Sequence, residues 1–211
     1  MTAEHADGLR EDALPGNSAK IRLLLDLIER RPGRVLDVGC GDLSLWTALK
    51  ARPEVIGVDI ELPEARIDGI ERRQASALEL PFGEEFGAVV STQVLDDLRD
   101  RPRALSEMRR VLRPGGTLFL TCDAGEIGRP WRARLRRVPL GPTLEELRAE
   151  AGAAGFELEV LRRYGLRDLK AAQANADGRA RLLTLELEEA LDPEDPRIWG
   201  LLYLRAHAGE A

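Results

Sequence analysis

The sequence has few of the residues that build disulfide-linked or metal-stabilised folds, with two cysteines and two histidines among 211 residues. Cys40 and Cys122 stand too far apart for a CxxC device, and His5 and His207 lie near opposite ends of the chain. Disulfide frameworks and zinc sites need such residues in closely spaced sets. The composition therefore argues against a disulfide scaffold, and we expect no metal site.

Long apolar runs and a surplus of positive charge are also missing. No stretch approaches the roughly 18 apolar residues of a membrane span, and residues 1–20 carry acidic charges where a secretion signal needs a basic start. The net charge is −6, whereas a general nucleic-acid binder needs a positive surplus. We therefore expect a cytoplasmic protein that binds neither membranes nor nucleic acid. Its oligomeric state is left open.

Apolar runs that alternate with helical patterns fill most of the chain. Such alternation indicates strands joined by crossover helices in a parallel sheet. The predicted strands cover 34–38, 54–59, 71–76, 87–92, 116–122, 156–164 and 199–206. The predicted helices cover 21–31, 43–51, 63–70, 102–112, 143–155 and about 166–191.

The stretch VLDVGCGDLSLW, residues 35–46, changes from strand to helix at Gly39 and Gly41. Glycines at this point expose backbone N–H groups at a helix start, and these groups can bind an anionic ligand group. Such glycines can also form a purely structural turn. A dinucleotide fingerprint would need glycine at Ser44. Asp59 ends the next strand, where a carboxylate can accept two ribose hydroxyls or simply face solvent.

Four stretches in this order resemble the class I S-adenosylmethionine-dependent methyltransferases, in particular those that act on small molecules. They are VLDVGCG, VIGVDIE, ALELPF and ALSEMRRVLRPGGTLFLT. The resemblance covers about residues 20–122 by motif and extends less specifically to 143–161 and the last strand. It implies a three-layer α/β sandwich with a Rossmann-like, mostly parallel seven-stranded sheet and an antiparallel last strand. It also implies methyl transfer from S-adenosylmethionine to a small organic acceptor.

On this resemblance, the chain is a single methyltransferase domain, 1–211. An N-terminal helical cap would cover 1–33, and the cofactor-binding core would cover 34–122. An arginine-rich lid would follow over 123–142, and 143–211 would complete the sheet.

The resemblance also implies contacts to the methionine and ribose parts of the cofactor. Gly39 and Gly41 would pass under the methionine part, Asp37 would help to hold that end, and Asp59 would bind the ribose. The expected contacts on this side are Asp37, Gly39, Cys40, Gly41, Asp59 and Ile60.

The adenine and the ammonium group would be met by later segments. Ser76 and Ala77 stand at the adenine-side positions, and the backbone carbonyls of Ser91 and Thr92 would meet the ammonium group. These assignments follow the family's pattern and not the spacing alone.

Three positions depart from the family's pattern. The third glycine of GxGxG is Leu43, the adenine-side aspartate is Ser76, and the acid that usually follows the phenylalanine before the fourth strand is Gly87. We expect cofactor binding to survive with modest affinity. A non-catalytic or cofactor-degenerate binding protein on the same scaffold is the alternative, and a nicotinamide-dependent oxidoreductase is a second.

The acceptor side offers fewer candidates. Asp97 is the candidate catalytic base and Asp96 a candidate substrate contact, although acids near a helix start are also favoured by the helix dipole. Five arginines crowd residues 129–137 around Trp131, and Trp131, Arg132 and Arg136 are candidate contacts to an anionic acceptor. A solvated helix face is the other interpretation of this cluster.

Overall fold

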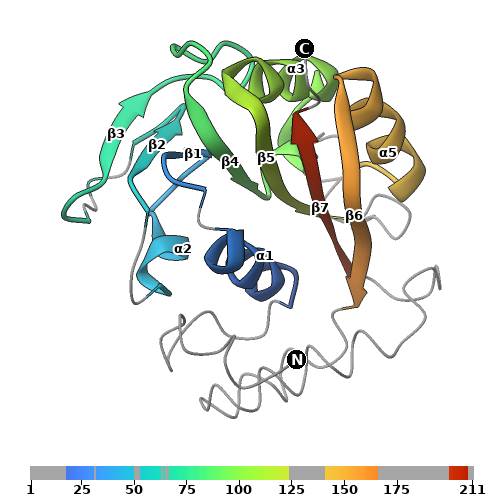
Figure 1. Cartoon of the computed structure of the whole chain (residues 1–211), viewed down its shortest axis with the longest axis horizontal. Coiled ribbons are helices and arrows are strands. Elements are labelled where there is room, and N and C mark those ends of the chain that lie inside the picture. Colours follow the sequence, from blue (N-terminus) through green and yellow to red (C-terminus); the bar gives the residue numbers. More distant parts are fainter. Residues whose placement is uncertain are drawn as a thin grey trace, which may run out of the picture.

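The computed structural model describes residues 18–30, 32–49, 53–62, 64, 67–123, 141–165 and 200–208. Its centre is a seven-stranded sheet with helices on both sides (Figure 1). The strands are β1 (Val35–Val38), β2 (Val55–Asp59), β3 (Glu71–Gln74), β4 (Phe86–Thr92), β5 (Leu112–Asp123), β6 (Phe156–Gly165) and β7 (Gly200–Ala208). The helices are α1 (Ser18–Arg30), α2 (Ser44–Thr47), the 3₁₀ helix η2 (Leu95–Asp97), α3 (Arg101–Val111) and α5 (Leu144–Ala153).

The strand order β3-β2-β1-β4-β5-β7-β6 confirms the expected sandwich. Strands β1 to β5 pair in parallel, and β7 runs antiparallel to both of its neighbours, β5 and β6. The order reverses between β1 and β4, because β2 and β3 lie on one side of β1 and the later strands on the other. In open α/β sheets ligands bind at such a switch point, beyond the carboxyl ends of the strands.

Two apolar cores lie on the two faces of the sheet. One packs α1 and α2 against the central strands, with Leu23, Trp46 and Phe119 fully buried. The other packs α3 and α5 against the opposite face, with Phe86 and Leu105 fully buried. Every residue of β1 is buried, which explains why this strand is a continuous apolar run broken only by an acid.

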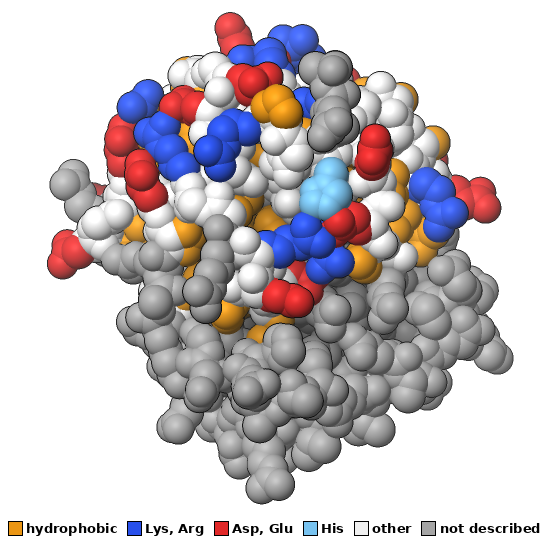
Figure 2. Space-filling model, in the orientation of Figure 1, with side chains coloured by type: hydrophobic (Ala, Val, Ile, Leu, Met, Phe, Trp, Pro, Cys, Tyr) orange, Lys and Arg blue, Asp and Glu red, His pale blue; other side chains and the backbone are white. Residues whose placement is uncertain are grey.

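Charged side chains attach the end of α1 to β6 and β7. Arg205 bonds Asp26 Oδ2 at 2.7 Å and Glu159 Oε2 at 2.7 Å, and Glu159 also contacts Arg30 and His207. Asp26 is 1% exposed, so its charge needs a partner of this kind. Positive and negative side chains are interleaved on the face that Figure 2 presents.

Two of the predicted helices differ from the expectation. Residues 67–70 form a turn and not a helix, with the Ile70 N–H donating to the Ile67 carbonyl and Gly69 in the left-handed region. The helix expected over 43–51 is only the single turn α2. A segment this short, bounded by proline or glycine, gains too few hydrogen bonds to offset helix nucleation. The helix expected at about 166–191 lies outside the described residues.

Gly87, one of the three departures from the family's pattern, has a packing cause. A Cβ at this position would lie 1.9 Å from the Pro32 carbonyl oxygen and 2.6 Å from an Arg113 guanidinium nitrogen. The close approach lies at the amino end of β4, where an open hollow of about 540 Å³ is also found. This hollow is at the opposite edge of the sheet from the switch point.

No helix in the described part of the chain is both long and apolar enough to cross a membrane.

Candidate cofactor site at the switch point

The carboxyl ends of β1, β2, β4 and β5 bring the predicted polar residues to one edge of the sheet. Asp37 pairs with Gly57 in register, and Asp59 ends β2 two residues later. Because side chains alternate along a strand, Asp37, Asp59 and Thr121 share the face covered by α1 and α2. Residues far apart in the sequence are therefore assembled by strand register.

The glycine turn after β1 uses its two glycines differently. Gly39 has φ 75° and Gly41 has φ 49°, both in the left-handed region that glycine adopts without a Cβ penalty. A Cβ on Gly39 would lie 2.1 Å from Val94 Cγ2, so this glycine lets the segment after β4 pack onto the turn. Apart from Gly41 itself and its two chain neighbours, no described residue has an atom within 4 Å of a Cβ at this position. Gly41 therefore has room for a ligand to approach its backbone.

Asp59 is bonded to this turn. Its Oδ2 accepts the Gly41 N–H at 2.9 Å and its Oδ1 accepts the Glu61 N–H at 3.2 Å. An ionised carboxylate offers about four lone-pair sites. Each oxygen can therefore accept one more hydrogen bond, which is what a ribose diol requires.

Asp37 lies beneath the turn. It is 2% exposed, and its Oδ2 accepts the indole N–H of Trp46 at 2.6 Å. The predicted core position of Trp46 is confirmed, since its side chain is fully buried. Asp37 therefore links β1 to α2 and supports the turn from the protein side.

Cys40 packs into the protein. Its Sγ would be 2.8 Å from a Cβ on Gly57, its N–H donates to the Val58 carbonyl at 3.0 Å, and its carbonyl accepts the Leu43 N–H at 2.9 Å. Burial, reinforced by the charges of Asp37 and Asp59, raises the pKa of the Cys40 thiol to about 12. The thiol therefore stays protonated at neutral pH.

Leu43 has a backbone conformation that favours glycine. Its φ of 63° and ψ of 16° place it in the left-handed region just before α2. The side chain is fully buried in the core beside Gly57 and Cys40. Leucine at this position therefore adds core packing but places a non-glycine residue in the left-handed region.

The adenine-side candidates follow β2 and β3. Ile60 is 65% exposed directly after Asp59, although it is a large hydrophobic residue. The Ser76 hydroxyl oxygen accepts the Leu78 N–H at 3.1 Å and so closes a turn around Ala77, which is buried. Ser76 therefore shapes this loop while its hydroxyl hydrogen is still able to donate.

The ends of β4 and β5 contribute buried hydroxyls. Ser91 Oγ and Thr121 Oγ1 are fully buried, and neither has a hydrogen-bond partner among the residues that the structure describes. Thr92 pairs with Thr121 across the two strands. The sequence analysis missed Gln93, which has φ 57° and donates its N–H to the Thr121 carbonyl at 2.7 Å. No local signal marks this residue, because its conformation is imposed by the neighbouring strand.

Two of the acceptor-side candidates lie in η2. Asp97 is exposed and Asp96 is half-buried, and the Asp97 N–H donates to the Val94 carbonyl at 3.1 Å. Among the residues described, no group of His, Cys, Asp and Glu could hold a metal ion. The candidates Trp131, Arg132 and Arg136 lie outside the described residues.

Comparison with known proteins agrees with this arrangement. Residues 36–120 match a family model described as a methyltransferase domain. A demethylmenaquinone methyltransferase of Thermus thermophilus is 36% identical over 135 residues, which are 56% of this chain and 61% of that protein. Across the first curated relatives, the chain covers only 24% to 61% of their length.

Two further matches are longer. The O-methyltransferase rstn1 of Aspergillus nomiae is 31% identical over 193 residues, covering 80% of this chain and 84% of that protein. The phosphoethanolamine N-methyltransferase 2 of Haemonchus contortus, solved with S-adenosyl-L-methionine, superposes with a TM-score of 0.63 at 18% identity over 90% of this chain and 52% of that one. The second match shows the fold, and the first covers nearly the whole of a named relative. The chain therefore belongs to the class I S-adenosylmethionine-dependent methyltransferases.

Proposed function

We propose that this protein binds S-adenosylmethionine at the carboxyl edge of β1, β2 and β4 and transfers its methyl group to a small organic acceptor. The observation that carries the proposal is the carboxylate of Asp59, held by the N–H of Gly41 beside the open side of that glycine. The relatives' names, demethylmenaquinone methyltransferase and O-methyltransferase, support an acceptor of the small-molecule class.

The residues at this edge fit the parts of such a cofactor. Asp59 would accept the ribose hydroxyls, and the exposed side chain of Ile60 would cover one face of the adenine. Ser76 would meet the adenine edge. The buried hydroxyls of Ser91 and Thr121 are polar groups at the end of the sheet that a bound ligand or water can satisfy.

The cofactor, when bound, supplies a methyl group on a sulfonium that is an excellent leaving group. The protein's part is then mainly to align the acceptor with the methyl carbon. Val94 packs onto Gly39 and so connects the cofactor turn to η2, where Asp96 and Asp97 stand. Where the acceptor is a hydroxyl or a protonated amine, we assign the role of base to Asp97, which is exposed.

The proposal is tested by calorimetric titration of S-adenosylmethionine and S-adenosylhomocysteine into the purified chain. We expect saturable binding of both at one site, and no binding of NAD or NADP. Absence of binding to both sulfur ligands would favour the cofactor-degenerate binding protein. Binding of a nicotinamide cofactor alone would favour the oxidoreductase.

We further propose that the lid over 123–142 uses its arginines to bind an anionic acceptor. If so, replacing Arg132 and Arg136 with alanine should raise the KM for an anionic acceptor and reduce the salt dependence of that KM. The affinity for S-adenosylhomocysteine should not change. Equal methylation of an acceptor and its uncharged analogue, with no effect of the double substitution, would assign these arginines to a solvated surface.

A further inference from the structure

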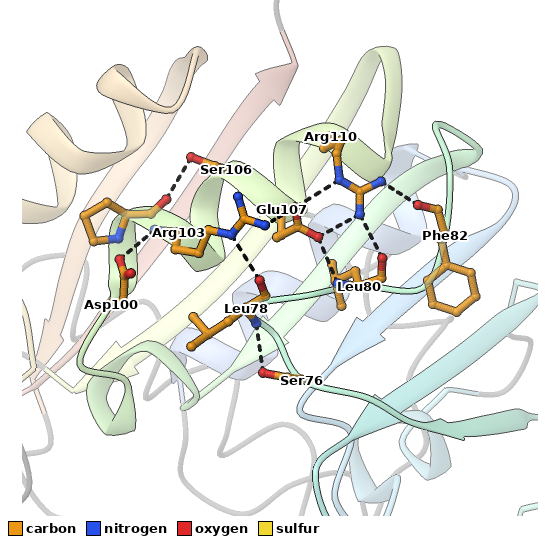
Figure 3. Close-up of polar contacts among 10 residues, drawn as sticks. Ser76, Leu78, Leu80, Phe82, Asp100, Arg103, Ser106, Glu107 and Arg110 are labelled. Carbon is orange, nitrogen blue, oxygen red and sulfur yellow. Dashed lines mark hydrogen bonds and ion pairs between the residues drawn. The ribbon is translucent and has the colours of Figure 1, made fainter.

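The segment 78–82 is held by charged side chains of α3 and not by a neighbouring strand (Figure 3). The Leu80 N–H donates to Glu107 Oε2 at 2.8 Å, and the Leu80 carbonyl accepts from Arg110 at 2.8 Å. One residue of the segment is therefore bonded through both of its backbone groups by two side chains one helical turn apart.

Two more bonds extend this hold to either side. Arg110 donates from its other terminal nitrogen to the Phe82 carbonyl at 2.6 Å, and Arg103 donates to the Leu78 carbonyl at 3.1 Å. Figure 3 shows the three side chains reaching the segment from one side of α3. Glu107, Arg110 and Arg103 together are called the α3 clamp below.

Glu107 is a buried charge whose partners all belong to this clamp or its segment. It is 4% exposed, and Arg110 bonds it at 2.7 Å while Arg103 lies at 3.5 Å. The hydrogen bond from Arg110 lowers the pKa of Glu107, against the opposite effect of burial, and the Leu80 N–H adds to the lowering. Only the acid of this cluster is buried, because the side chains of Arg110 and Arg103 are 45% and 55% exposed. A buried charge is costly unless it is paired and hydrogen-bonded, so Glu107 depends on its clamp partners.

The clamped segment leads directly from the adenine-side candidates. Ser76 bonds the Leu78 N–H and Leu78 is bonded by Arg103, so the turn at Ser76 and Ala77 continues without interruption into the clamp. We infer that Glu107 and Arg110 are positioning residues that hold the adenine-side wall of the cofactor site. This inference rests on the proposed function, and neither residue touches the cofactor itself.

The expected rise in the apparent Kd depends on the fraction of molecules that hold the segment in its binding conformation. When only a fraction of the molecules hold the segment in its binding conformation, the apparent Kd rises by the inverse of that fraction. Loss of the two carbonyl bonds from Arg110 should shift the segment toward conformations that do not bind, and a segment held in about a tenth of the molecules is the expected result. The apparent Kd should then rise about tenfold.

The test uses Arg110→Met, Glu107→Gln and a matched control, Glu150→Gln. The Arg110 side chain is 45% exposed, and methionine keeps its apolar stem while removing the donors. The control weakens another close pair, between α3 and α5, in which Arg101 donates to both oxygens of Glu150 at 2.7 to 3.2 Å without touching the segment. Hydrogen exchange of the Leu80 amide, the Kd of S-adenosylhomocysteine and the melting temperature are measured for each protein.

Both clamp variants should speed Leu80 exchange and raise the Kd about tenfold, while the control changes the Kd less than about twofold at a comparable loss of melting temperature. If wild type binds S-adenosylhomocysteine and the folded clamp variants bind equally well, the inference is wrong while the proposed function stands. If wild type itself does not bind, the proposed function fails first, and the inference fails with it.

Discussion

Asp59→Ala is expected to weaken the binding of S-adenosylhomocysteine at least about 100-fold, because two hydrogen bonds to a charged group are lost at about 1.5 to 3 kcal/mol each. The structure adds a second reason. Asp59 also accepts the Gly41 N–H at 2.9 Å, so the substitution removes the group that orients the glycine turn. The effect should exceed that of any single substitution among the arginines of 129–137. The measurement is calorimetric titration at fixed ionic strength.

Two further variants separate the effect of the Asp59 charge on binding from the effect of its side-chain shape. Asp59→Asn keeps an acceptor for the Gly41 N–H and should weaken binding less than Asp59→Ala. Glu61→Gln makes the same change of charge on an exposed neighbour and should leave the Kd within about twofold. Unchanged affinity in Asp59→Ala, with a normal melting temperature, would remove this residue from the site and with it the main support for the proposed function.

At Leu43 we expect the glycine variant to be more stable than the alanine variant, which is the reverse of the usual order in a helix. Leu43→Ala loses a fully buried side chain, which costs about 2 to 5 kcal/mol, and it keeps the left-handed backbone at φ 63°. Leu43→Gly loses the same packing but relieves the left-handed strain, worth about 1 to 2 kcal/mol. We therefore expect both variants to be less stable than wild type. The free energy of unfolding of Leu43→Gly should exceed that of Leu43→Ala by about 1 kcal/mol.

Urea unfolding at 25 °C measures this order. Ser44 provides the control, because it is the next residue, is exposed and lies within α2. There alanine should be more stable than glycine by up to about 1 kcal/mol, the ordinary helix preference. Leu43→Ala at or above the stability of Leu43→Gly would show that position 43 carries no left-handed strain in solution.

The three departures from the family's pattern each have a structural cause. Leu43 and Gly87 both have packing explanations, since one fills the core and the other leaves room for the Pro32 carbonyl. Ser76 has a local role in closing a turn. None of the three removes the carboxylate of Asp59 or the open side of Gly41, so they do not argue for loss of the cofactor.

Much of the fold follows from the sequence by itself. Buried parallel strands are continuous apolar runs, and β1, β2, β4 and β5 were each placed within a few residues because that pattern is local. Asp59 is a candidate because it stands where such a run ends, and the carboxyl ends of parallel strands meet at one edge. The candidate Asp37 depends on the resemblance to the methyltransferases. Residues 67–70 form a turn where a helix is expected, because local periodicity does not report the cost of starting a helix between proline and glycine.

Other features were decided only by the tertiary structure. Asp37 faces the indole of Trp46, Cys40 lies against Gly57, and Glu107 reaches the backbone of Leu80. Each of these contacts joins segments whose separation in sequence says nothing about their distance in space. A carboxylate in a strand or helix has the same local pattern whether it binds a ligand, supports a turn or clamps a loop. Strand register and helix packing choose among these roles, because they alone determine which donor lies within hydrogen-bond distance of each acid.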